Sequence, residues 1–147
     1  MKIVNEVKIN FLSKSANEAF ARTAVCAFLS QLDPTVDEVV DVKTAVSEAV
    51  TNSIVHAYKE TIGKIVMTMR ILEDNTIYIK IKDNGCGIDN IKMAMTPLFT
   101  TAKNDERAGL GFAVMESFMD KVKVYSDTGK GTSVIMTKKL NSRDFYD

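Results

Sequence analysis

The sequence predicts an α/β fold of the α+β kind, a two-layer α/β sandwich whose mostly antiparallel, mixed sheet carries its helices on one face. Three observations support this prediction. The chain has 147 residues, close to the size of one domain with one core. Segments with the two-residue period of strands form two hairpins, and segments with helical spacing precede each hairpin. Adjacent hairpins give antiparallel pairs, and such a sheet carries its helices on one face. We therefore expect residues 1–147 to form a single domain.

The first part of the chain predicts one strand and two helices. Residues 2–12 are rich in β-forming residues and read as an edge strand. Ser15-Ala-Asn-Glu18 has the form of a capping box, so a helix is expected from there to about Leu32. An Asp-Pro pair ends that helix. Thr35-Val-Asp-Glu38 is a second capping box, and it opens a helix that we expect to continue through about Tyr58.

The second part predicts four strands and one short helix around a long loop. The segment 76–83 alternates isoleucine with polar residues, as a strand with one buried face does. A polar, glycine-punctuated stretch then runs from residue 84 to 109, longer than an ordinary connection, and such loops are usually functional or disordered. The expected order is β-α-α-β-β-loop-α-β-β, with the later elements at 64–72, 76–83, 110–120, 121–126 and 132–139.

Composition excludes several classes of protein. The 19 Lys and Arg residues balance the 19 Asp and Glu residues, so bulk charge does not favour nucleic acid or an anionic membrane, although a local basic patch is compatible with this count. No uncharged apolar run approaches the roughly 18 residues of a membrane span, and the N-terminus lacks the apolar core of a signal peptide. The two cysteines match neither disulfide nor metal spacing. We expect a cytoplasmic protein with reduced thiols that binds no membrane and no nucleic acid directly.

Glu48 and Asn52 are the first candidates for chemistry. They are four residues apart on the second expected helix, about 40° apart around its axis, and so they share a face. A carboxylate can accept a proton, and an amide oxygen is a hard ligand suited to Mg²⁺. Taken alone, such a pair is far more often part of a solvated helix face.

Two glycine-containing segments are the next candidates. Asp83-Asn-Gly85-Cys-Gly87 follows a strand, where an aspartate can accept a hydrogen bond from an exocyclic amine and glycines allow close approach of the backbone. The same residues also make an ordinary tight turn. Gly109-Leu110-Gly111 stands before a helical pattern, where free N–H groups at a helix start form a phosphate site. A lone Gly-x-Gly is weak support for that role.

The three motifs together are far more specific than any one of them. Glu48-x-x-x-Asn52, Asp83-x-Gly85-x-Gly87 and Gly109-x-Gly111 resemble the N-box and the two glycine boxes of the GHKL, or Bergerat-fold, ATPase and kinase superfamily. Gly131-Thr132 resembles its closing threonine motif. The segments 45–58, 97–101 and 106–112 narrow the resemblance to the anti-sigma factor serine kinases, and the similarity covers nearly the whole chain.

The resemblance implies a role for each matched residue in binding ATP with Mg²⁺. Glu48 would be the catalytic general base for a serine hydroxyl, and Asn52 would ligate Mg²⁺ on the ATP phosphates, with Thr51 beside it able to reach phosphate. Asp83 would bind the adenine amine, helped by Thr132. A lid at about residues 88–108 would sense phosphate through two cations. The remaining nucleotide-binding residues are these lid cations and the residues of the glycine boxes: Lys103, Arg107, Gly85, Gly87, Gly109, Leu110 and Gly111.

The resemblance also implies partners. In the sporulation members of the family, the expected partners are an RNA-polymerase sigma factor of the F type, held in the ATP state, and an anti-anti-sigma protein that is phosphorylated on serine. Arg22 would contact protein partners, and the chain would form a homodimer. Physical reasoning alone favours a solvated arginine on an amphipathic helix. The alternatives are a stress-response relative, a nucleotide-gated sigma-binding module without significant kinase activity, and the detached ATPase domain of a sensor kinase.

Overall fold

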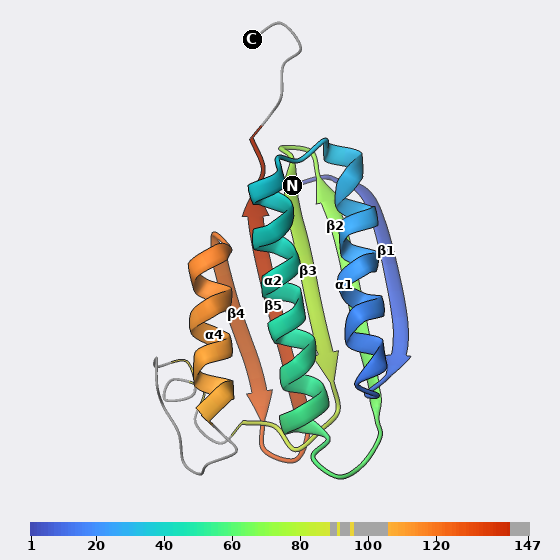
Figure 1. Ribbon diagram of the computed structural model, residues 1–147, viewed down its shortest axis with the longest axis vertical. Helices are drawn as coiled ribbons and strands as arrows, with labels where there is room; N and C mark the ends of the chain where they lie inside the picture. The colour runs from blue at the N-terminus through green and yellow to red at the C-terminus, as the bar shows by residue number, and fades with distance from the viewer. Residues whose placement is uncertain (89–90, 92–94, 96–105, 142–147) are drawn as a thin grey trace, which may run out of the picture.

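The structure is a computed structural model that describes residues 1–88, 91, 95 and 106–141, with the backbone alone at 106–109. Figure 1 shows the order of the elements along the chain. They are β1 (Ile3–Leu12), α1 (Ala16–Leu29), the 3₁₀ turn η1 (Ser30–Leu32), α2 (Val36–Asn52), the π-helical turn η2 (Ser53–Ala57), β2 (Lys64–Leu72), β3 (Thr76–Asp83), α4 (Glu106–Phe118), β4 (Lys121–Asp127) and β5 (Gly131–Lys139).

The strands form one five-stranded sheet in the order β1-β2-β3-β5-β4. Each neighbouring pair is antiparallel, so the predicted fold class is confirmed, and the part of the sheet that we expected to be mixed is antiparallel in the described strands. The reason lies in the last hairpin. Helix α4 brings the chain back so that β4 runs in the same direction as β3, but β5 lies between these two strands and separates them (Figure 1).

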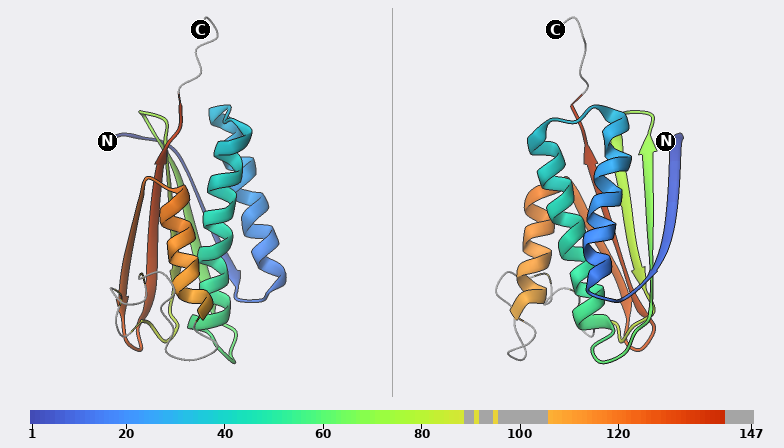
Figure 2. Two further views of the ribbon diagram at one scale, coloured as in Figure 1. Left: turned by 60° about the vertical axis from the view of Figure 1, so that its left-hand side comes forward. Right: turned by 45° about the vertical axis from the view of Figure 1, so that its right-hand side comes forward.

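Helices α1, α2 and α4 cover one face of the sheet, as both views of Figure 2 show. On β3 the isoleucines at 77, 79 and 81 are buried and the residues between them are more exposed, so the predicted alternation is confirmed. The helices contribute fully buried residues such as Leu29, Val46 and Met115 to the same core. Among the described residues, none of the helices is long and apolar enough to cross a membrane.

The two predicted capping boxes have different outcomes. Thr35 and Glu38 form one, because the Thr35 hydroxyl accepts from Glu38 N and the Glu38 carboxylate accepts from Thr35 N. The box predicted at Ser15 and Glu18 is wrong. Ser15 has helical dihedral angles and makes no side-chain capping bond. The Glu18 carboxylate instead accepts a hydrogen bond from Ser47 of α2, so a contact between two helices replaces a local cap.

Three predicted helix boundaries need correction. The first helix becomes a 3₁₀ turn from Ser30 onward, and the α-helical part of the second ends at Asn52 and not at Tyr58. Beyond Asn52 the chain continues as the π-helical turn η2. Helix α4 begins at Glu106, four residues before the predicted start at 110, and ends at Phe118. The predicted boundary followed the Gly109–Gly111 pair, but both glycines lie inside the helix, where packing against α2 overrides their low helix propensity.

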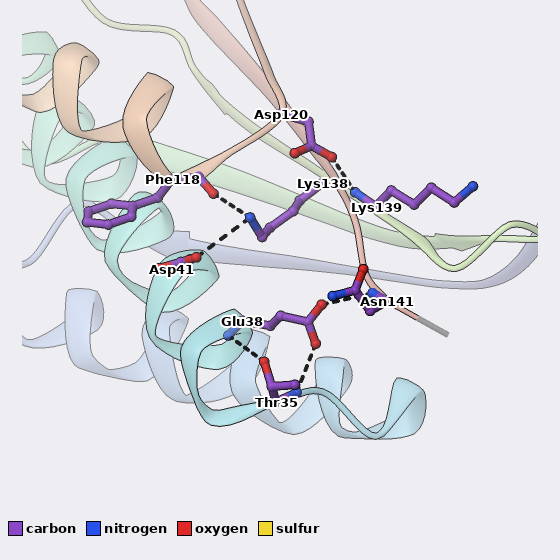
Figure 3. A network of polar contacts seen from close by, with 8 residues as sticks. All are labelled: Thr35, Glu38, Asp41, Phe118, Asp120, Lys138, Lys139 and Asn141. Atoms are coloured by element: carbon purple, nitrogen blue, oxygen red, sulfur yellow. Dashed lines mark hydrogen bonds and ion pairs between the residues drawn. The ribbon is translucent and has the colours of Figure 1, made fainter. Parts of the chain in front are cut away.

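A polar network ties the start of α2 to the end of the sheet (Figure 3). The buried Glu38 carboxylate accepts from Thr35 N and from Asn141 N, each at 2.9 Å. Nearby, Lys138 Nζ donates to the Phe118 carbonyl at the end of α4 and lies 3.6 Å from Asp41 of α2. The network therefore holds two helices against β5 at the end of the molecule where α2 begins.

Glu38 gives this network a defined pH dependence. Burial by itself raises the pKa of Glu38, but the N–H bonds from Thr35 and Asn141 and the nearby Lys138 outweigh burial and leave the pKa below its ordinary value. A carboxylate with a lowered folded-state pKa stabilises the fold above its unfolded pKa, and the contribution disappears as the pH falls through the folded pKa.

We predict that Glu38→Gln lowers the free energy of unfolding by about 1–2 kcal/mol at pH 7, because the amide can replace only one of the two charge-assisted bonds. The difference from the parent protein should shrink as the pH falls below about 4.5. Urea denaturation between pH 3.5 and 7, with the exposed Glu73→Gln as a control, measures this. A Glu38→Gln difference that stays constant with pH would contradict the assignment.

Candidate functional site

The predicted site residues come together at one end of the sandwich. Helix α2 and strand β3 end there, and helix α4 and strand β5 begin there (Figure 1). Four segments that are far apart in the sequence therefore bring Glu48, Asn52, Asp83, Gly111 and Thr132 to one end of the fold. Helix α4 also begins at this end, and the first N–H groups of any helix lack partners within the helix, a feature that favours anions.

Glu48 and Asn52 lie against Gly111, as close packing of α2 on α4 requires. A β-carbon added at Gly111 would stand 3.2 Å from Glu48 Oε2 and 3.3 Å from Asn52 Oδ1. Only glycine leaves both polar groups undisturbed at this point of contact. The structure thus brings the first and third motifs together, with a carboxylate and an amide side by side near the start of a helix.

The polar atoms of the Asn52 side chain lack hydrogen-bond partners within the described residues. Both Oδ1 and Nδ2 are buried, and neither makes a hydrogen bond within the described part of the chain. A buried amide without partners is costly, so such a group usually has a ligand, an ion or a water beside it. The carbonyl oxygen of this amide fits Mg²⁺, which prefers oxygen ligands. Thr51, the residue before it on α2, is half-buried.

Asp83 is the buried carboxylate at the end of β3. Its Oδ1 accepts from Gly85 N at 2.9 Å and from Thr132 N at 3.2 Å, and its Oδ2 accepts from Ser53 Oγ at 2.9 Å. Burial raises the pKa of Asp83, and these three hydrogen bonds oppose the rise. A carboxylate has about four acceptor positions, so the described partners leave one for a ligand.

Thr132 lies opposite Asp83 in the register of β3 and β5. Its hydroxyl is 2.8 Å from the Ser126 hydroxyl of β4, and Ser126 also donates to the Gly131 carbonyl at 2.9 Å. The Ser126 proton is therefore used, so Thr132 donates to Ser126 and its oxygen can still accept. The register and the hydrogen bond from Thr132 N thus bring Asp83 and Thr132 together, and their predicted role in binding adenine stays a prediction.

Close packing of the backbone explains why positions 85 and 87 are glycine, independently of any contact with a ligand. A β-carbon at Gly85 would stand 2.4 Å from the Ala57 carbonyl oxygen, and one at Gly87 would stand 2.2 Å from the Asp127 carbonyl oxygen. Gly87 also has a φ of 77°, which favours glycine. The loop after β3 thus lies tightly against η2 on one side and the β4–β5 turn on the other.

Two residues that the motifs did not indicate also build the site. Ser53 is buried in the first position of η2 and donates to Asp83. The Tyr58 hydroxyl accepts from Asn84 N at 2.6 Å and donates to the Lys64 carbonyl at 2.7 Å, and burial raises its pKa. The sequence pointed to these two residues only through their hydroxyl groups, which are close to Asn52 in the chain. A regular helix through Tyr58, as predicted, would have directed these hydroxyl groups away from Asp83 and Asn84.

The other predicted residues are on α4, on α1, or outside the described part of the chain. Arg107 and Gly109 are in the first turns of α4, where the structure describes the backbone, and Leu110 is 45% exposed. Lys103 and most of the predicted lid at 88–108 lie outside the described residues. Arg22 is on α1, 3.6 Å from Glu18 in an ion pair.

Comparison with known proteins places this geometry in a class. Residues 11–138 match the family model of the histidine kinase-like ATPase domain. The chain is 54% identical over 142 residues to the anti-sigma F factor of Thermoanaerobacter sp. strain X514, covering 97% of this chain and 99% of that protein. It is 56% identical over 140 residues to the anti-sigma F factor of Caldanaerobacter subterraneus subsp. tengcongensis, covering 95% and 97%.

A solved structure agrees on the fold. The RsbU and RsbW domains of Rv1364c from Mycobacterium tuberculosis match with a TM-score of 0.69 at 17% identity, covering 95% of this chain and 34% of that chain. The fold and site define a histidine kinase-like ATPase domain. Within that class the chain belongs to the anti-sigma F factor family.

We predict that Asp83→Asn folds and is at least as stable as the parent protein at pH 7, with a gain of about 1 kcal/mol or less. The asparagine oxygen can keep both backbone N–H bonds, and its amide can donate to Ser53. Because the folded-state pKa of Asp83 is raised, its stabilising effect is full below the unfolded pKa and is lost as the pH rises through the folded pKa.

The asparagine variant has no such loss, so its advantage should appear above about pH 4 and then become constant. Thermal unfolding from pH 4 to pH 8 measures the difference, with Asp120→Asn as a control at the other end of the sheet. An Asp83→Asn variant that is clearly less stable at pH 7 would show that the hydrogen bonds to the carboxylate outweigh its burial.

Proposed function

We propose that this chain is an ATP-dependent protein serine kinase that also acts as an anti-sigma factor. The observation that carries the proposal is the placement of Glu48 and the unpartnered Asn52 amide against Gly111, near the N-terminus of α4. This group offers a carboxylate, a hard oxygen ligand and a helix N-terminus at one point, which are the parts that phosphoryl transfer needs. Asp83 and Thr132 supply a separate recognition point at the same end.

Adenine recognition falls to Asp83 and Thr132. The remaining acceptor position of Asp83 suits the exocyclic amine of adenine, and the Thr132 oxygen can accept as well. Guanine presents a carbonyl at the position of that amine, so two acceptors would face a third. The pair thus favours ATP over GTP. Three donors, Ser53 Oγ, Gly85 N and Thr132 N, each occupy one acceptor position of the carboxylate and so fix its orientation.

The phosphates fall to the other half of the site. The first N–H groups of α4, up to that of Gly109, would hold them, because the helix itself leaves these groups without partners. Leu110 and Gly111 lie just further into the helix and would border the phosphates. Asn52 would hold Mg²⁺ through its oxygen, and when bound the ion would neutralise charge on the phosphates. Thr51 lies beside this position. From the lid, Lys103 and Arg107 would add positive charge to the γ-phosphate, and Gly87 would set the path of the chain into the lid.

Glu48 is the general base in this proposal. Its carboxylate accepts the proton of the substrate serine as the hydroxyl oxygen bonds to the γ-phosphorus, and the bond to the ADP oxygen breaks. The products are phosphoserine and ADP, and the proton rests on Glu48 until solvent removes it. Gly111 matters because a β-carbon there would stand 3.2 Å from Glu48 Oε2, so the carboxylate would have to move by a few tenths of an ångström.

The partners follow from the family. The relatives at 54% and 56% identity are named anti-sigma F factors, which supports a sigma factor of the F type as the protein held in the ATP state. The serine substrate would be an anti-anti-sigma protein, and the protein would act as a homodimer in the cytoplasm, where RNA polymerase works. Arg22, half-buried on α1 and partly held by Glu18, is the proposed contact for these proteins.

We predict that Glu48→Gln keeps ATP affinity within about threefold and lowers phosphotransfer by about 10²-fold or more, because the amide has the shape of the carboxylate but cannot accept the proton. The measurement is transfer of labelled γ-phosphate to a purified anti-anti-sigma protein, with nucleotide binding followed by calorimetry. The exposed Glu116→Gln on α4 is the matched control. Near-normal transfer by Glu48→Gln would remove Glu48 from the role of base.

We predict that Asn52→Ala abolishes the part of ATP affinity that depends on Mg²⁺. The parent protein should lose at least about tenfold in affinity when EDTA removes the metal, whereas Asn52→Ala should bind equally weakly with and without it. Asn52→Asp keeps an oxygen at this position and should keep the metal dependence. If Asn52→Ala responds to Mg²⁺ as strongly as the parent protein, Asn52 is not the ligand.

A further inference from the structure

The face of the sheet opposite the helices is strongly cationic. On β3 the isoleucines point to the helices, and Tyr78, Lys80 and Lys82 point the other way. Residues that pair directly across neighbouring strands lie on the same face, and so does every second residue along a strand. Starting from Tyr78, Lys80 and Lys82, the register therefore assigns the residues of all five strands to one face or the other. Its cationic residues are Lys8, Lys64, Arg70, Lys80, Lys82, Lys121, Lys123 and Lys139.

Acidic residues are scarce on the same face. The strand carboxylates that the register assigns to it are Glu6, which pairs with Arg70, and Asp127 at the end of β4. The whole chain has no net charge, so the excess of positive charge here is balanced elsewhere, in part by the acidic residues of α2. The fold therefore separates charge that the composition alone averages to zero.

The lysines are spread across the whole width of the sheet. One row of directly paired residues runs Lys8, Thr68, Lys80, Ile135 and Lys123, from β1 through β2, β3 and β5 to β4. Neighbouring strands are about 4.8 Å apart, so each lysine of this row is roughly 10 Å from the next one. Such an array matches a flexible chain of regularly spaced negative charges better than it matches a single ion.

Two tyrosines lie among these cations. Tyr125 of β4 is 56% exposed and belongs to the next row, which also contains Lys82. Tyr78 lies under the Arg70 guanidinium, which is 4.9 Å from the centre of its ring. Tyr78 is half-buried, so Tyr125 offers the exposed ring. An exposed aromatic ring on a cationic sheet is a surface on which unpaired bases stack, while the cations follow the phosphate backbone.

From this arrangement we infer that the open sheet face binds single-stranded nucleic acid, contrary to the expectation drawn from the balanced net charge of the chain. Lysine is depleted at protein–protein interfaces, so a face with seven lysines argues against an acidic protein as the partner. Duplex DNA is read by an element that enters a groove, and this face is a sheet whose long side chains lie across several strands. The inference does not depend on the proposed kinase reaction, because the ATP site is on the helical side.

The test uses a fluorescent oligothymidylate of about 20 nucleotides, the intact protein, and anisotropy over a range of salt concentrations. Binding should weaken with a slope near −0.7 in log K against log salt for each phosphate neutralised. The triple variant Lys8→Ala, Lys80→Ala, Lys123→Ala should lose at least about tenfold in affinity at about 50 mM salt, and the slope should become shallower by about 2.

The control removes the same charge elsewhere. Lys14→Ala, Lys43→Ala, Lys59→Ala takes three positive charges from the loop before α1, from α2 and from the turn after η2, and should change affinity by less than about twofold. Equal losses in the two triple variants would overturn the inference in favour of bulk charge. Absence of any binding at about 50 mM salt would overturn it outright. Both variants should bind ATP normally, which separates this test from that of the kinase site.

Tyr125 distinguishes nucleic acid from a generic polyanion. Tyr125→Phe keeps a ring and should bind as the parent protein does, whereas Tyr125→Leu should weaken binding by about fivefold or more. If Tyr125→Leu has no effect and polyglutamate of equal charge displaces the oligonucleotide as well as unlabelled oligothymidylate does, the face is a site for acidic proteins and the inference is wrong.

Discussion

The Asp83 carboxylate is the contact on which the arrangement of the site depends. It accepts hydrogen bonds from Ser53 at the end of α2, from Gly85 in the loop that follows β3, and from Thr132 at the start of β5. Three segments are therefore held by one side chain in a place where burial opposes its charge. Burying a carboxylate costs free energy, so a carboxylate whose acceptor positions were all taken by the fold would be an unfavourable way to join these segments. One that keeps an acceptor position open also has a reason in ligand binding.

Much of the fold follows from local patterns that tertiary packing reinforces. The alternation on β3 and the turn at residues 73–75 define a hairpin in the sequence, and both are present. Thr35 and Glu38 form the predicted capping box, because Glu38 can accept from Thr35 N with one oxygen and from Asn141 N with the other. At Ser15 the same pattern fails, since Glu18 finds Ser47 on the neighbouring helix. A capping box is a local signal, and a contact between helices can override it.

The part of the candidate site that lies on a regular α-helix could be predicted from the sequence. The part that depends on the π-helical turn after α2 could not. Residues four apart on a helix share a face, so Glu48 and Asn52 could be paired from the sequence alone. The contribution of Ser53 could not, because it requires the π-helical turn that follows Asn52. A π turn adds a residue to the turn, and no residue type in this segment announces one. Tyr58 was missed for a different reason, because its two hydrogen bonds reach the two ends of the β2–β3 hairpin, a tertiary contact that local patterns do not show.

The two faces of the sheet carry different chemistry because strands alternate. Each residue on β3 that builds the core is followed by one that faces away from the helices, so Asp83 shares a face with the isoleucines and Lys82 belongs to the opposite one. One strand thus supplies a buried acid to the candidate site and cations to the open face, with no loop or added domain between them. In a chain of zero net charge, this alternation is what separates the charges, and a sum over the sequence cannot reveal it.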